Sequence, residues 1–134
     1  MRMLEKDEEE ADIQVSWQDQ QNINEFSKYN NKLQLLEESY DAKKTEKEYL
    51  DDLTSELEEL ELTDEEALVK YRIGEAFVSL TLEAAQERNS KAKEVLEEEI
   101  EQIKSQMDDA VEKMDALKKV LYARFGNAIN LEKD

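Results

Sequence analysis

The feature that most constrains the fold is a regular spacing of apolar residues in the second half of the chain. From residue 100 to residue 121 they recur at alternating steps of three and four, without a break over three heptads. They are Ile100, Ile103, Met107, Ala110, Met114, Leu117 and Leu121. This spacing is the seam of a coiled coil, in which one stripe of a helix packs against a second helix. An earlier set joins it through a four-residue offset, the spacing of a stutter, and consists of Leu82, Ala85, Asn89, Ala92 and Leu96.

A second, less regular seam predicts another helix, from Trp17 to about Leu62. Its apolar residues are Phe26, Tyr29, Leu33, Leu36 and Tyr40, then Leu50, Leu53, Leu57 and Leu60. Between the two sets Lys43 and Lys47 occupy seam positions, and the register shifts by three residues, a stammer. The chain has no proline and two glycines, so little interrupts long helices. Both helices come to about 44 residues, roughly 66 Å, and we expect them to pair antiparallel.

Capping signals mark the ends of these helices. Ser16 and Asp19 have the S-x-x-D spacing of a capping box, in which the hydroxyl can accept from the backbone amide three residues on and the carboxylate lies favourably at a helix N-terminus. Thr81 is a suitable N-cap for the second helix, and Gly126 a suitable stop. The second helix is therefore predicted over about 82–125.

Between the helices, β-branched and aromatic residues alternate with polar ones over about residues 68–80, the pattern of a β-hairpin. A two-residue turn at Gly74-Glu75, with glycine first, pairs Ile73 with Ala76 and aligns the strands. One face of the hairpin is then wholly apolar, whereas the other carries a mixed set, Lys70, Arg72, Phe77 and Ser79.

A lone two-stranded hairpin is marginal in water, and this one exposes two unpaired edges as well as an apolar face. The simpler alternative is that it folds back onto its own helices. We expect instead that it pairs with strands of other subunits and forms the oligomer interface. The predicted interface residues are Val69, Tyr71, Ile73, Gly74, Ala76, Phe77, Val78 and Leu80.

Antiparallel pairing brings together two apolar groups, one near each end of the chain. They consist of Trp17, Ile23 and Phe26 on one side and Tyr122, Phe125, Ile129 and Leu131 on the other. At the end of a coiled coil such residues either present apolar surface to an unfolded client or close the coil as a hydrophobic lock. Both readings remain open from the sequence.

Catalytic and cofactor chemistry has no basis in the sequence. There is no cysteine and no histidine, which removes disulfides, thiolate metal sites and the commonest proton carrier. Neither phosphate-binding glycine motif occurs, so no nucleotide-driven cycle is expected. Acidic pairs such as Glu58-Glu59 and Asp108-Asp109 are expected on solvated helix faces, which offer no closed pocket for catalytic carboxylates. We expect no enzyme activity, cofactor or metal.

The charge balance also restricts the partners. A net charge of −18 repels phosphate backbones and anionic lipid, so neither nucleic acid nor a membrane is an expected partner. Residues 1–15 are strongly acidic with little apolar content, which predicts a disordered tail unlike a secretory signal. The expected location is the cytoplasm or the nucleus.

Four stretches carry a resemblance to the β-type subunits of the prefoldin family. They are residues 19–26 (DQQNINEF), 47–52 (KEYLDD), 71–77 (YRIGEAF) and 115–117 (DAL) leading into 121–131 (LYARFGNAINL). The last is the most distinctive, and the likeness spans roughly residues 14–132. Residues 16–132 are accordingly identified as a prefoldin β-type domain.

The resemblance implies an assembly and a function that the residues alone do not. It implies a heterohexamer of two α-type and four β-type subunits, joined by their hairpins into a β-barrel platform with projecting coiled coils. It also implies capture of unfolded or nascent actin and tubulin by the coil tips, and transfer to the cytosolic chaperonin without ATP. The residues themselves leave two other readings: a structural coiled-coil adaptor that homodimerises, and an acidic chaperone for basic proteins such as histones.

Overall fold

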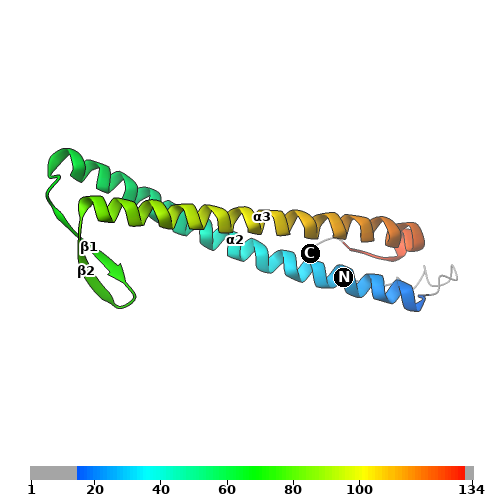
Figure 1. Ribbon diagram of the computed structural model, residues 1–134. Helices are drawn as coiled ribbons and strands as arrows, with labels where there is room; N and C mark the ends of the chain where they lie inside the picture. The colour runs from blue at the N-terminus through cyan, green and yellow to red at the C-terminus, as the bar shows by residue number, and fades with distance from the viewer. Residues whose placement is uncertain (1–14, 132–134) are drawn as a thin grey trace. The chain divides into compact units, whose positions relative to one another are not determined.

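A computed structural model describes residues 15–131, which form two long helices with one β-hairpin between them (Figure 1). In chain order the elements are α2 (Trp17–Thr63), β1 (Leu68–Ile73), β2 (Ala76–Thr81), α3 (Leu82–Phe125) and a short 3-10 helix, η1 (Gly126–Ala128). This confirms the predicted order of helix, hairpin and helix. The acidic segment predicted to be a disordered tail lies outside the described residues, except for Val15. No helix among residues 15–131 is long and apolar enough to cross a membrane.

The chain divides into two compact units. Of the residues that the structure describes, unit 1 combines 15–38 with 104–131, and unit 2 is Ser39–Ile103. Within each unit a stretch of α2 and a stretch of α3 share an apolar core. In unit 1 this core is a large cluster that includes Phe26 and Leu121. In unit 2 it is a smaller cluster around Leu57, Leu82 and Ala85.

The helical seams are as predicted. Every predicted seam residue of α2 and α3 is buried or partly buried, including Lys43, Lys47 and Asn89. The 3–4 spacing keeps these residues on one side of each helix, and that side faces the partner helix. The polar seam positions are thus true members of the helix interface in unit 2.

Local backbone signals explain where the helices begin and end. The Asp19 amide donates to Ser16 Oγ at 3.0 Å, and the Ser16 amide donates to Asp19 Oδ2 at 2.9 Å, which completes the predicted capping box. The Ala84 amide donates to Thr81 Oγ1 at 3.2 Å, which caps α3. Gly126 ends α3 with a φ of 59°, a conformation that favours glycine.

Candidate functional site

The β-hairpin has the predicted register. Ile73 pairs with Ala76, Tyr71 with Val78, and Val69 with Leu80. Gly74 has a φ of 62°, which the tight turn requires and a side chain would strain. Because side chains alternate across a strand, this register places all six of these paired residues on one face.

The apolar face is covered at its base and open toward its turn. Val69 and Leu80 pack against the cluster of Leu57, Leu82 and Ala85 on the two helices. Tyr71 is partly buried, with the Arg88 guanidinium 5.8 Å from its ring centre. Beyond it Ile73, Ala76 and Val78 are exposed. Folding back onto the chain's own helices therefore covers only the base of the hairpin.

The opposite face of the hairpin also carries large apolar side chains. Phe77 is 65% exposed and pairs across the strands with Arg72, whose Nε donates to the Gly74 carbonyl at 2.9 Å. Leu68 is exposed at the start of β1. Within residues 15–131 the sheet has only these two strands, so the outer backbone groups of both strands lack sheet partners. Strand pairing with another chain would satisfy them.

The predicted tip residues form a buried cluster in unit 1, with one exception. Ile23, Phe26, Phe125, Ile129 and Leu131 are buried together, and Tyr122 packs against them. The Leu131 amide donates to the Tyr122 hydroxyl at 3.3 Å, which holds the segment after η1 against α3. This arrangement fits the hydrophobic lock, because these side chains offer little surface to a client.

Trp17 differs from the other predicted tip residues. Its side chain is 75% exposed and is no part of the buried cluster. Of the seven predicted client-binding residues, Trp17 is therefore the one that lies outside the buried cluster. The physical reason is position: Trp17 is the first residue of α2, two residues before Asp19, with which the buried side of the helix begins. It is the described tip residue most accessible to a ligand.

A buried carboxylate ties the two helices of unit 1 together. Arg124 Nε on α3 donates to Asp19 Oδ2 at 3.0 Å, and the Asp19 side chain is only 8% exposed. The Ser16 backbone amide, and then Arg124, hold the pKa of Asp19 below its usual value, although burial opposes this. Sequence reasoning found the capping box but missed Arg124, because its partner is 105 residues away.

Replacing Asp19 is expected to destabilise the folded chain in a pH-dependent way. Asp19→Ala removes the carboxylate that accepts from the Ser16 amide and from Arg124, at an expected cost of about 1–2 kcal/mol at pH 7. Because the folded pKa is lowered, this contribution is present above the unfolded pKa of about 4 and disappears as pH falls through the folded pKa. Urea unfolding of both proteins between pH 7 and pH 2 measures it. A difference that stays constant down to pH 2 would contradict the ionised pair.

Ion pairs join the two helices of unit 2 at and beside the polar seam positions Lys43 and Lys47. Lys43 Nζ lies 2.5 Å from Glu99 Oε2, and Lys93 Nζ lies 2.9 Å from Asp51 Oδ1. A longer pair joins Lys47 to Glu97 at 3.9 Å. Hydrogen bonding to Glu99 raises the pKa of Lys43, and hydrogen bonding to Lys93 lowers the pKa of Asp51. These pairs explain how charged residues are tolerated in the seam, since each is neutralised across it.

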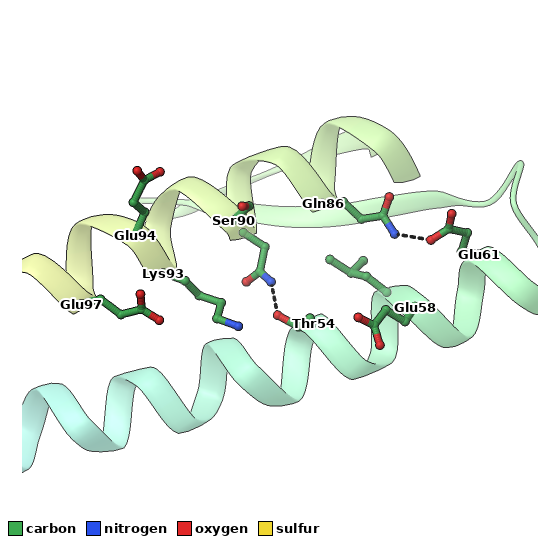
Figure 2. A pocket seen from close by; sticks show the side chains of 10 residues that line it. Thr54, Glu58, Glu61, Gln86, Ser90, Lys93, Glu94 and Glu97 are labelled. Atoms are coloured by element: carbon green, nitrogen blue, oxygen red, sulfur yellow. Dashed lines mark hydrogen bonds between the residues drawn. The ribbon is translucent and has the colours of Figure 1, made fainter.

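Beside these pairs a groove of about 470 Å³ runs between α2 and α3. Its lining is mainly polar and comprises Thr54, Leu57, Glu58, Glu61, Gln86, Asn89, Ser90, Lys93, Glu94 and Glu97. Figure 2 shows Lys93 reaching from α3 toward α2, and Gln86 bonded to Glu61 at 2.9 Å. No cluster of three or more His, Cys, Asp or Glu residues suited to a metal occurs in the described part of the chain.

Comparison with known proteins gives consistent results. The family described as "Prefoldin subunit" matches residues 20–128. The chain is 38% identical over 120 residues to prefoldin subunit 4 of Saccharomyces cerevisiae, covering 90% of this chain and 91% of the relative. It is 36% identical over 124 residues to prefoldin subunit 4 of Homo sapiens, with 92% and 90% covered. Probable prefoldin subunit 4 of Dictyostelium discoideum is 39% identical over 131 residues, with 97% and 96% covered.

The fold also matches a solved structure. The crystal structure of the prefoldin beta subunit from Thermococcus strain KS-1 superposes with a TM-score of 0.74, covering 85% of this chain and 97% of that one. The sequence identity is 20%, so this likeness concerns the fold. Both the resemblance noted in the sequence and the predicted helix–hairpin–helix architecture are confirmed.

Proposed function

Because the chain belongs to the prefoldin family of chaperone subunits, we propose that it acts as the subunit 4 member of a heterohexamer with α-type and β-type partners. In this role the β-hairpin is the assembly surface. The observation that carries the proposal is the incomplete cover of the hairpin. Ile73 and Val78 are exposed on its apolar face, and both strand edges lack sheet partners within residues 15–131. Strands from neighbouring subunits would cover the face and pair with the edges.

The proposed activity is ATP-independent capture of unfolded or nascent actin and tubulin in the cytoplasm. Trp17 supports a contact at the coil tip, because a large exposed aromatic side chain binds apolar segments of a client. Several such weak contacts from different subunits would add up through effective concentration, and each would release quickly. No deep pocket is needed for this mode of binding.

Transfer to the cytosolic chaperonin is the last part of the proposal. Residues 17–32 and 113–131 carry six basic and three acidic side chains, although the net charge of the whole chain is −18. Lys32 and Lys119 are exposed among them. A basic tip favours docking to an acidic surface of a partner, whereas the acidic remainder of the chain repels other acidic coils.

The mass of the chain in solution tests the proposal. We expect a defined hexamer by light scattering after size exclusion only when α-type and β-type prefoldin subunits are added. The chain alone is expected to be helical but poorly assembled, because its hairpin lacks cover. A stable homodimer that ignores the other subunits would instead favour a structural adaptor. Tight, strongly salt-dependent binding of histones by the chain alone would favour an acidic chaperone.

A further inference from the structure

Asn89 is a buried polar residue in the apolar seam of α3, with 3% of its surface exposed. Its Nδ2 donates to Thr54 Oγ1 on α2 at 2.6 Å. The Thr54 hydroxyl proton is already donated to the Leu50 carbonyl at 2.9 Å, so Thr54 can only accept from Asn89. This fixes the orientation of the Asn89 amide. Among the described residues its buried Oδ1 has no hydrogen-bond partner, which costs stability.

The Asn89–Thr54 pair lies directly beside the base of the hairpin. Leu53 and Leu57 flank Thr54 along α2, and Ala85 lies one turn before Asn89 on α3. These three residues belong to the cluster that also packs Val69 and Leu80. The register of α2 against α3 at this layer therefore sets where the chain leaves one helix for β1 and where β2 enters the other.

Few other contacts at this layer determine the register. The seam of α2 carries leucine at positions 50, 53, 57 and 60. Each of these leucines can pack against α3 in place of another, so they allow α2 to shift along α3. The ion pairs are partly exposed and the hydrogen bond from Gln86 to Glu61 is exposed, and such contacts contribute little. A slip of one heptad would place Asn89 opposite a charged side chain, Lys47 or Glu61, instead of the Thr54 hydroxyl. A charge costs more to bury in the seam than a hydroxyl.

We propose that the Asn89–Thr54 pair is a positioning element, which fixes the register of α2 and α3 beside the hairpin at the cost of some stability. A buried asparagine at one seam position has this effect in coiled coils generally. By fixing the register, the pair fixes the positions of β1 and β2 along the helix axes. We infer that strand pairing with other subunits requires these positions. The register part stands on its own, whereas the assembly part rests on the proposed function.

Asn89→Leu tests the register in the isolated full chain. The melting temperature is expected to rise by about 4 °C as the orphaned oxygen is replaced by an apolar side chain. Spin labels at Ser55→Cys and Ser90→Cys report the distance between the helices, and the chain has no cysteine of its own to interfere. The distance distribution is expected to be narrow with Asn89 and broad or double-peaked with leucine. Dilution with unlabelled chain separates distances within one chain from those between chains.

The same variant tests hexamer assembly with the other subunits. Asn89→Leu is expected to raise the concentration needed for half-assembly about tenfold despite its greater stability. Thr54→Ser keeps the hydroxyl and is expected to behave like the unaltered chain. Met107→Leu, an apolar exchange elsewhere in the seam, is the control for core changes and is expected to leave assembly unchanged.

The outcomes separate the two parts of the inference. A lower melting temperature, or an unchanged distance distribution, for Asn89→Leu would overturn the register role. If Asn89→Leu fails to fold, the double variant Thr54→Val/Asn89→Leu tests the register role by its melting temperature and its distance distribution. This variant leaves no unpaired hydroxyl opposite the leucine. Altered distances with normal assembly would overturn the positioning of the hairpin alone. Failure of the unaltered chain to assemble would instead count against the proposed function.

Discussion

Val78→Asp is expected to abolish incorporation of the chain into the hexamer while leaving its helices intact. Val78 is 37% exposed on the apolar face of the hairpin, so the isolated chain tolerates a carboxylate there at little cost. Burial of the same unpaired charge against another subunit costs several kcal/mol, enough to prevent stable association. Light scattering of the mixed subunits measures incorporation, and circular dichroism of the chain alone measures the helices.

Ser79→Asp is the matched control, since it adds the same charge at the next residue of β2 on the opposite face. It is expected to assemble with a much smaller loss. Equal loss in both variants would mean that charge rather than the apolar face is responsible, and normal assembly of Val78→Asp would exclude this face from the interface. Tyr71→Asp is a poorer probe, because Tyr71 is partly buried beside Arg88 and its loss disturbs the isolated chain.

The fold was predictable because its elements depend on local periodicity. The 3–4 spacing from Ile100 to Leu121 places the apolar residues on one stripe of a helix, which is buried when it packs against another helix. The absence of proline leaves that helix unbroken. For the hairpin, the position of one glycine was sufficient to predict the strand register. With Gly74 first in a two-residue turn, alternation along the strands determines every pair, and the observed register is the predicted one.

The polar contacts between the helices were less predictable, because they join residues that are distant in sequence. Arg124 joins Asp19 across 105 residues, and Thr54 joins Asn89 across 35. Neither pair has a local signature. Asn89 stood out as a polar residue in the seam, but nothing in the sequence identified Thr54 as its acceptor. Similarly, the composition of the tip could not separate exposed Trp17 from buried Phe125, since both are large and apolar.

The burial of the tip residues leads to a second large expected effect, on stability. Leu121 is fully buried, at 0% exposure, within the cluster that contains Phe26 and Phe125. Leu121→Ala is expected to lower the free energy of unfolding by about 3 kcal/mol, through lost apolar burial and the cavity left behind. Because many domains have only about 5–15 kcal/mol in total, such a loss is a large share of the free energy of unfolding. Urea unfolding followed by circular dichroism measures it in the full chain.

Val120→Ala provides the comparison, because it removes an aliphatic side chain from the adjacent residue of α3, where 52% of the surface is exposed. Its expected cost is within about 0.5 kcal/mol. Similar losses at both positions would mean that the cluster does not lock the tip. A large loss at Leu121 alone would establish the lock, and contact with clients would then require either exposed side chains such as Trp17 or local opening of the cluster.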